Sequence, residues 1–192
     1  MKVGTDKCGY QLYEDFLSGD LRGFERIVKG YREMLILFIR QYVGDYQAAE
    51  DISQDVFVKL YMKKPRYSPK ASFKTWLYTI AKREAINYLK KQSRQTDEDA
   101  PVAGEDGRDY LETILADERK IVLHHALECL TPEYRRVLYL YYFEDFSVNE
   151  IGVLLKKKPR QISDLLYKAK KALKSVILKG GEKYEILRGS IV

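Results

Sequence analysis

Hydrophobic residues recur at intervals of three and four through most of this chain, which is the spacing that places them on one face of an α-helix. Residues 21–43 show the pattern most clearly and predict one long helix, which Gly44 ends in the C-terminal position that favours glycine. The buried face of this helix is expected to carry Phe24, Ile27, Val28, Tyr31, Leu35 and Phe38. No stretch alternates convincingly between polar and apolar residues as a strand does, so the sequence predicts an all-α protein.

Further helices are predicted at about residues 46–62 and 72–91, separated by turn signals that include Pro65. The second of these helices has a buried face that is expected to carry Phe73, Trp76, Leu77 and Ile80. Later in the chain a helix is predicted over residues 117–130. The next helix begins where Thr131 can cap its first turn and Pro132 can occupy that turn.

A polar segment, TDEDAPVAGEDGRDYLE at residues 96–112, separates the two groups of helices. It combines low hydrophobicity with glycines, a proline and many carboxylates, so it cannot bury enough surface to offset the entropy lost on ordering. The sequence therefore predicts two small helical domains joined by an acidic flexible linker. We expect the domains at residues 1–94 and 117–178, the linker at 95–116 and a C-terminal tail at 179–192.

Residues 147–173 predict a helix-turn-helix. Ser147 and Glu150 have the spacing of a capping box for a first helix that ends near Leu155, and Pro159 can start a second helix. The second helix has an apolar stripe at Ile162, Leu165, Leu166, Ala169 and Leu173. An apolar back with a polar outward face is what a DNA-recognition helix needs, although an ordinary helical hairpin with a solvated basic face would give the same pattern. The candidate DNA-reading residues are Lys158, Arg160, Gln161, Asp164, Tyr167, Lys168 and Lys171.

The helix at residues 46–62 has a second face that is unusual for a solvent-exposed surface. Its core stripe is predicted at Ala48, Ala49, Ile52, Val56 and Leu60. Apolar residues lie outside that stripe together with two acids and an amide: Glu50, Asp51, Gln54, Phe57, Val58 and Tyr61. Such a mixture favours docking of a protein partner over contact with water. The alternative is that another part of the chain covers this face.

The helix at residues 72–91 is both basic and aromatic, and the loop before it adds Lys63, Lys64, Arg66 and Tyr67. Cations can follow a nucleic-acid backbone while aromatic rings accept unstacked bases, so this mixture is typical of binding to an unpaired strand. A clamp on duplex phosphates would need the cations but not the rings. The candidate residues are Lys70, Lys74, Tyr78, Lys82, Arg83, Asn87, Lys90 and Lys91.

The distribution of charge supports two anion-facing surfaces. The 192-residue chain has a formal net charge of +6. Residues 63–95 contain ten bases and one acid, and residues 156–192 contain eleven bases and three acids. Between them, residues 96–118 contain nine acids and one base. Two separate basic blocks are the electrostatic pattern of nucleic-acid binding at two places.

Several other classes of protein are disfavoured. The longest purely apolar run, residues 34–39, is far shorter than the ~20 residues of a membrane-spanning helix, so we expect a cytoplasmic protein without membrane insertion. Cys8 and Cys129 lack metal-ligand or redox spacing, and Cys129 is expected to be buried. His124 and His125 have no organised acid, nucleophile or ligand set around them, so we expect no enzyme, no metal and no cofactor.

Three segments taken together, AEDISQDVFVKLY, SFKTWLYTIAKREAINYLKK and LECLTPEYRRVLYLYYFEDFSVNEIGVLLKK, resemble a bacterial RNA polymerase sigma factor of the two-domain extracytoplasmic-function class. The resemblance covers about residues 12–178. It implies that the first domain binds the clamp helices of core RNA polymerase and melts the −10 element. It implies that the second domain binds the polymerase flap and recognises the −35 element of promoter DNA.

The resemblance also assigns residues. The family's D-x-x-Q-[DE] clamp motif falls on Asp51, Gln54 and Asp55, which gives a polymerase-binding set of Asp51, Gln54, Asp55, Phe57, Val58 and Tyr61. Its W-L-x-x-I-A segment falls on Trp76, Leu77, Ile80 and Ala81. Its E-I-A segment falls on Glu150, Ile151 and Gly152. The basic aromatic set becomes the −10 surface and the recognition-helix set becomes the −35 surface.

The chain departs from the family pattern at both DNA-binding surfaces. Lys82, Arg83 and Asn87 replace the usual Arg-Asn followed by Asp, so the −10 base preference does not transfer. The recognition turn has Lys156 and Lys158 in place of Gly-x-Ser, so the −35 sequence does not transfer either. The resemblance further implies an anti-sigma factor as a partner and a monomer when free. The alternative function is a helix-turn-helix regulator that acts without polymerase.

Overall fold

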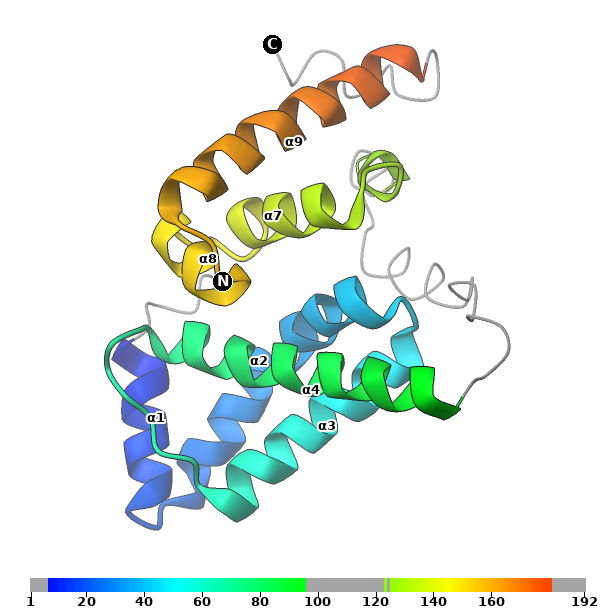
Figure 1. Ribbon diagram of the computed structural model, residues 1–192. Coiled ribbons are helices and arrows are strands. Elements are labelled where there is room, and N and C mark those ends of the chain that lie inside the picture. Colours follow the sequence, from blue (N-terminus) through cyan, green and yellow to red (C-terminus); the bar gives the residue numbers. More distant parts are fainter. Residues whose placement is uncertain (1–6, 96–122, 124, 181–192) are drawn as a thin grey trace. The chain divides into compact units, whose positions relative to one another are not determined.

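The computed structural model describes residues 7–95, 123 and 125–180, and these residues form α-helices, turns and connecting loops without a strand. The chain divides into two compact units, Met1–Gly104 and Glu105–Val192, and the described part of each is built on helices (Figure 1). The all-α prediction is therefore confirmed. The predicted linker lies outside the described residues except for Gln95, and so does the tail except for Lys179 and Gly180.

The described part of unit 1 contains α1 (Lys7–Leu17), α2 (Leu21–Val43), α3 (Tyr46–Lys63) and α4 (Phe73–Gln95). Helix α2 packs against the other three, and α4 lies across both α2 and α3 (Figure 1). The predicted helices at 21–43, 46–62 and 72–91 correspond to α2, α3 and α4, and α4 continues four residues further than expected.

Capping residues set the ends of α2 and α3. Asp20 caps α2 by accepting the backbone N–H of Arg22 at 3.0 Å. Hydrogen bonds from the Arg22 side chain, and then the one from its backbone, lower the pKa of this carboxyl. Gly44 has a positive φ of 82° at the end of α2, a conformation that glycine adopts without strain. Asp45 then caps α3 by accepting the N–H of Ala48 at 2.7 Å. Two residues thus complete the connection between the helices.

Helix α1 crosses α2 at very close range. A Cβ atom at Gly23 would lie 2.3 Å from the carbonyl oxygen of Leu12, so only glycine fits at the crossing. The close approach seats Tyr13 and Phe16 of α1 in the core, where both are at most 1% exposed. Burial raises the pKa of Tyr13 to about 12, and its hydroxyl donates to the Pro65 carbonyl oxygen at 2.7 Å.

The buried side of α4 differs from the prediction. Phe73 and Leu77 are fully buried as expected, but Trp76 and Ile80 are only half-buried. Tyr78 is fully buried, and its ring centroid lies 4.8 Å from that of Phe38. The core therefore includes the Tyr78 side of α4, while α1 and the loop before α4 contact Trp76 through Tyr13 and Tyr67.

The described part of unit 2 contains α7 (Pro132–Tyr142), α8 (Val148–Leu155) and α9 (Pro159–Lys179), preceded by a helical turn at 125–128. Residues 117–122 of the helix predicted at 117–130 lie outside the described residues. The predicted caps are confirmed. Thr131 accepts the N–H of Tyr134, and Ser147 and Glu150 form a reciprocal capping box. The core between the three helices contains Val137, Leu138, Leu140, Ile151, Leu154, Ile162, Leu166 and Ala169, all buried.

The turn between α8 and α9 is tight. Lys156 adopts the left-handed conformation with φ of 55°, and the N–H of Lys157 donates to the Gly152 carbonyl oxygen at 2.9 Å. A Cβ atom at Gly152 would lie 2.8 Å from the Lys157 carbonyl oxygen. Glycine at position 152 therefore makes room for a turn that itself contains no glycine.

One burial prediction is wrong in this unit. Cys129 is exposed, because it follows the helical turn at 125–128 and lies just before α7, outside the core that α7, α8 and α9 enclose.

Candidate protein-docking and nucleic-acid interfaces

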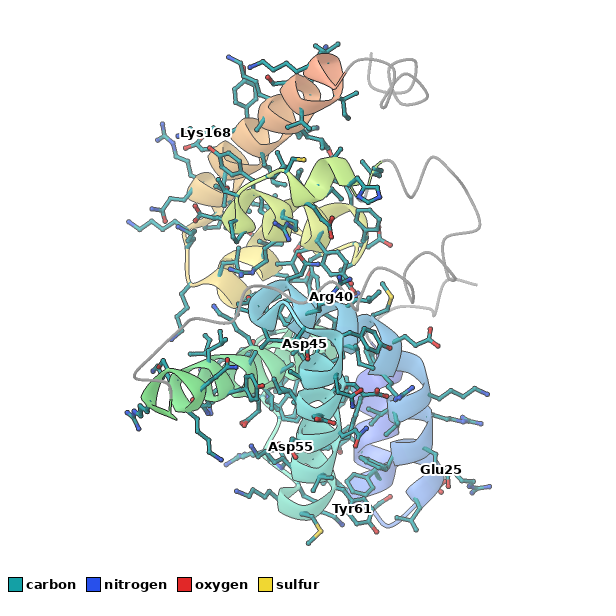
Figure 2. All side chains as sticks on the ribbon, turned by 90° about the vertical axis from the view of Figure 1, so that its right-hand side faces the viewer. Glu25, Arg40, Asp45, Asp55, Tyr61 and Lys168 are labelled. Carbon is teal, nitrogen blue, oxygen red and sulfur yellow. The ribbon has the colours of Figure 1, made fainter. Side chains whose placement is uncertain are left out.

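A stripe of acidic and apolar side chains runs along the outward side of α3. Asp51, Gln54 and Asp55 are exposed, Val58 is 58% exposed and Met62 is 73% exposed. Their spacing of three, four, seven and eleven residues places them on one helical face. Figure 2 labels Asp55 and Tyr61 on this helix. We call Asp51, Gln54, Asp55, Val58, Tyr61 and Met62 the α3 docking face.

Phe57 does not belong to this face, contrary to the sequence prediction. Its side chain is 6% exposed. Because α3 packs against both α2 and α4, its buried arc is wider than a single stripe and includes Phe57 at one edge. Met62 was missed by the prediction, although it lies four residues after Val58 and seven after Asp55 on the same helical face.

Ion pairs distinguish the framework acids of unit 1 from those of the α3 docking face. Glu50 pairs with Arg32 of α2, and Glu84 of α4 pairs with Lys59. Asp51 and Asp55 have no ion-pair partner among the residues that the structure describes. Acids that join helices are thus neutralised within the unit, whereas the acids of the docking face remain available to a partner.

Aromatic packing holds the apolar end of the α3 docking face in place. The ring centroid of Tyr61 lies 5.6 Å from that of Phe16 and 5.2 Å from that of Phe24, although Tyr61 itself is 42% exposed. Figure 2 shows Tyr61 at the same end of unit 1 as Glu25, the neighbour of Phe24. The exposed Leu17 and Leu21 flank the turn that joins α1 to α2 and extend the apolar surface of this unit.

A basic stripe runs along the C-terminal half of α4. Arg83, Asn87, Lys90 and Arg94 are exposed at intervals that place them on one face, with Lys91 exposed beside them. We call these five residues the α4 basic stripe. Lys70 is exposed in the loop before α4, whereas Lys74 and Lys82 are half-buried.

Tyr78 is not available as a base-stacking ring, which corrects the sequence prediction. It is fully buried, and the Nζ atom of Lys74 lies 5.5 Å from its ring centroid. Three partly exposed rings lie together near the start of α4, those of Tyr10, Tyr67 and Trp76. The ring centroid of Tyr67 lies 5.2 Å from that of Tyr10 and 5.4 Å from that of Trp76. Tyr10 is 39% exposed and the other two are half-buried.

The loop that carries Tyr67 is held by hydrogen bonds from tyrosine hydroxyls. Tyr67 donates to the Ala71 carbonyl oxygen at 2.6 Å, and Tyr13 donates to the Pro65 carbonyl oxygen. This aromatic cluster of Tyr10, Tyr67 and Trp76 is therefore a preformed surface. Tyr10 was missed because its position depends on the packing of α1 against α4, which no local pattern encodes.

In unit 2, the outward face of α9 is polar along its N-terminal half. Ile162, Leu166 and Ala169 are buried as predicted, and Leu165 and Leu173 are half-buried. Tyr167 is 69% exposed. Figure 2 labels Lys168 on α9. All seven residues predicted to read DNA are exposed: Lys158, Arg160, Gln161, Asp164, Tyr167, Lys168 and Lys171.

A second group of exposed aromatic residues lies at the end of α7 and was not predicted. Tyr141, Tyr142 and Phe143 are 39%, 50% and 45% exposed. The Nζ atom of Lys170 lies 5.6 Å from the ring centroid of Tyr142, and its hydrogen bond to Tyr142 raises the pKa of Lys170. Glu144 is buried beneath this group and accepts from the Tyr139 hydroxyl at 2.9 Å. Burial is the main cause that raises the pKa of Tyr139, and the negative charge of Glu144 raises it further.

Two further features bear on the class of protein. Within residues 7–95, 123 and 125–180, no cluster of three or more His, Cys, Asp or Glu side chains could hold a metal ion. None of the helices described is long and apolar enough to cross a membrane.

Comparison with known proteins agrees with this arrangement. The family model for sigma-70 region 2 matches residues 27–95, which include α3 and α4, and that for sigma-70 region 4 matches residues 117–173, which include the helix-turn-helix. The chain is 29% identical over 181 residues to the RNA polymerase sigma-H factor of Pseudomonas aeruginosa, covering 88% of this chain and 93% of the relative. It is 28% identical over 168 residues to the extracytoplasmic-function sigma factor SigW of Bacillus subtilis, covering 82% of this chain and 90% of the relative.

The fold also matches solved structures. One is the sigma factor RpoE in complex with the anti-sigma factor NepR from Bartonella quintana, with a TM-score of 0.61 and 18% identity over 80% of this chain and 96% of that one. Another is CnrH in complex with the cytosolic domain of CnrY, with a TM-score of 0.62 and 18% identity over 92% of this chain and 98% of that one. Both show the two-domain helical fold. The chain belongs to the extracytoplasmic-function class of bacterial RNA polymerase sigma factors.

Proposed function

We propose that this chain is a sigma subunit that binds core RNA polymerase and directs it to promoters through separate contacts with −10 and −35 DNA. The observation that carries the proposal is the division of charge over the surfaces described above. One helix of unit 1 presents acids that have no ion-pair partner among the described residues, beside apolar groups, while another helix presents a basic stripe. The recognition helix of unit 2 presents a second cationic face. Such a chain acts on chromosomal DNA in the cytoplasm and needs no catalytic residues of its own.

The α3 docking face is the proposed contact with the clamp helices of the polymerase. The exposed Asp51 and Asp55 can accept charge-assisted hydrogen bonds from basic groups of a partner. Val58 and Met62 supply apolar area at the same surface. The exposed aromatic residues at the end of α7 offer a second apolar surface, which we assign to the polymerase flap.

The α4 basic stripe and the aromatic cluster of Tyr10, Tyr67 and Trp76 are the proposed binding surface for the melted −10 strand. Extruding a base costs a few kcal/mol, and stacking on an aromatic ring returns ~1–3 kcal/mol per base. Cations of the stripe can follow the backbone of the captured strand. The cluster takes the role that the sequence analysis gave to Tyr78.

Helix α9 is the proposed reader of the −35 element in the major groove. Its buried side fixes it against α7 and α8, and its polar outward face is accessible from the N-terminal end, where recognition helices contact bases. We also propose that an anti-sigma factor regulates the chain, because one solved structure that shares its fold, RpoE of Bartonella quintana, is in complex with the anti-sigma factor NepR. The free chain is expected to be a monomer.

The test is run-off transcription with purified core polymerase on a promoter library. The chain should confer selection of a start site, and Asp51→Lys with Gln54→Ala should abolish binding to core while the circular dichroism spectrum remains that of the parent. Glu33→Lys, a charge reversal at an exposed position of α2, is the matched control and should bind core normally. Unchanged binding by the Asp51 variant would remove the clamp assignment.

A helix-turn-helix regulator that acts without polymerase would bind DNA as a dimer and would not bind core polymerase. Analytical ultracentrifugation with and without core separates the two functions. No observation of the described residues favours this alternative.

A further inference from the structure

The outward face of α9 contains one carboxylate among many cations. Asp164 is the only acid of this helix, which carries six Lys or Arg residues. It is exposed and has neither a hydrogen bond nor an ion pair within the part of the chain that the structure describes. Arg160 lies one turn before it and Lys168 one turn after it on neighbouring positions of the helix surface. This position is the sixth residue of α9, within the segment from which a recognition helix contacts bases.

The neighbouring amide cannot supply a second acceptor. The Oε1 atom of Gln161 accepts the backbone N–H of Lys158 at 2.8 Å and so completes the start of α9. Only the Nε2 group of Gln161 remains to face DNA, and it can only donate. Arg160 and Lys168 are donors as well. The Tyr167 hydroxyl can donate or accept, so Asp164 is the one side chain among the exposed candidates of α9 that can only accept.

A carboxylate directed at DNA is repelled by the phosphates. A hydrogen bond donated by a base can offset this repulsion. In the major groove the donors are the amino groups of cytosine N4 and adenine N6, whereas guanine and thymine present acceptors. Adenine also places its N7 acceptor beside the amino group, which repels a carboxylate, but cytosine places a C–H group there. Cytosine is therefore the base that best fits Asp164.

We propose that Asp164 determines promoter specificity at one position of the −35 element by accepting a hydrogen bond from cytosine N4 and by repelling guanine and thymine. The proposal rests on the function proposed above, because it requires α9 to enter the major groove. Asp164 thus discriminates between bases although its negative charge lowers the overall attraction of α9 for DNA. The surrounding cations, Arg160 and Lys168, supply that attraction for every sequence.

The first experiment is transcription with core polymerase from a promoter library randomised over the −35 region. The parent chain should require a cytosine at one position, with guanine or thymine about 10-fold less active. Asp164→Ala should reduce this preference to about 2-fold or less, and Asp164→Asn should shift it towards adenine, which asparagine can bind through both N6 and N7. Asp145→Asn removes the same charge from the exposed turn between α7 and α8 and should leave every base preference unchanged.

The second experiment tests the chemical group. N4-methylcytosine at the selected position carries a methyl group on the amino nitrogen that faces the major groove. It should lower the activity of the parent chain about 10-fold and leave that of Asp164→Ala within about 2-fold. Circular dichroism of each variant checks that α9 is intact.

The outcomes separate this proposal from the function on which it rests. If the parent chain directs no promoter-dependent transcript, the proposed function fails. If it directs transcription but Asp164→Asn has the same base preferences as the parent, or N4-methylcytosine has no effect, the function stands and the role of Asp164 is overturned.

Discussion

The two basic helices, α4 of unit 1 and α9 of unit 2, each carry a single acid but use it differently. Glu84 of α4 pairs with Lys59 of α3, so the acid joins two helices and the exposed stripe of α4 retains only cations and one amide. Asp164 of α9 is unpaired in the described residues and lies among the exposed cations. A surface that binds the phosphate backbone of a strand needs donors and cations but no hydrogen-bond acceptor. A surface that distinguishes bases needs an acceptor as well, because some bases present donors.

The aromatic residues divide in the same way. The N-terminal half of α4 packs against rings from α1 and from the preceding loop, which gives Tyr10, Tyr67 and Trp76 beside the basic stripe. The outward face of α9 carries one exposed ring, Tyr167. Rings of the kind that accept extruded bases thus lie beside the basic stripe of α4. Helix α9 instead has a polar outward face of the kind that enters a major groove.

The largest expected effect comes from removing two cations from either helix. Arg83→Ala with Lys90→Ala should weaken binding of a single-stranded −10 oligonucleotide by the holoenzyme. Arg160→Ala with Lys171→Ala should weaken binding of duplex −35 DNA. Each pair should lower the slope of log K against log salt by about two units for its own target, because two phosphate contacts are lost. Fluorescence anisotropy over a salt series measures both, and a pair that affected both targets equally would remove the distinction between the helices.

The aromatic cluster gives the next effect. Tyr67→Ala should raise the dissociation constant for the single-stranded −10 oligonucleotide by a factor that corresponds to about 1–3 kcal/mol, the value of one stacked base. Binding of duplex −35 DNA should not change. The matched control is Tyr88→Ala, which removes an exposed ring from α4 outside the cluster. Equal losses for both substitutions would show that ring position does not matter.

Substitutions in the turn before α9 should change the free energy of unfolding of unit 2 by about 1–3 kcal/mol. Gly152→Ala should destabilise unit 2, because the added methyl group meets the Lys157 carbonyl oxygen. Lys156→Gly should act in the opposite direction by relieving a left-handed lysine. Urea denaturation monitored by circular dichroism measures both. A neutral result for Gly152→Ala would mean that the turn relaxes to accommodate the methyl group.

The smallest effect concerns the two acids. Glu84→Gln should lower the free energy of unfolding of unit 1 by at most about 1 kcal/mol, since its pair with Lys59 is partly exposed. Asp164→Asn should leave stability unchanged, because no described residue pairs with it. The same urea series compares them, and a larger loss for Asp164→Asn would indicate a structural role for that acid.

Local patterns in the sequence predicted the features that depend on near neighbours. The bounds of α2, the caps at Thr131 and Ser147, and the buried stripe at Ile162, Leu166 and Ala169 all follow from spacing along one helix. The exposed faces of α3 and α9 were predicted for the same reason. The family resemblance then supplied functions that the spacing alone left open.

The errors concern residues whose surroundings come from distant parts of the chain. Phe57 is buried because α3 contacts two helices, and Tyr78 is buried because α4 turns that side to α2. Trp76 is half-buried under Tyr13 of α1, a helix that the sequence analysis did not predict. Gln161 is a different case. Its hydrogen bond to the Lys158 N–H is one half of a capping box, and the sequence signature is incomplete because a lysine at the N-cap cannot accept the other half.

The hydrogen bond from Lys158 to Gln161 separates two duties within one turn of α9. Gln161 and the apolar side at Ile162 and Leu166 start and anchor the helix, whereas Arg160, Asp164 and Tyr167 take no part in that anchorage. The latter three positions can therefore be randomised together without unfolding the scaffold. If α9 reads the −35 element as proposed, a collection of such variants is a source of sigma factors with new promoter preferences.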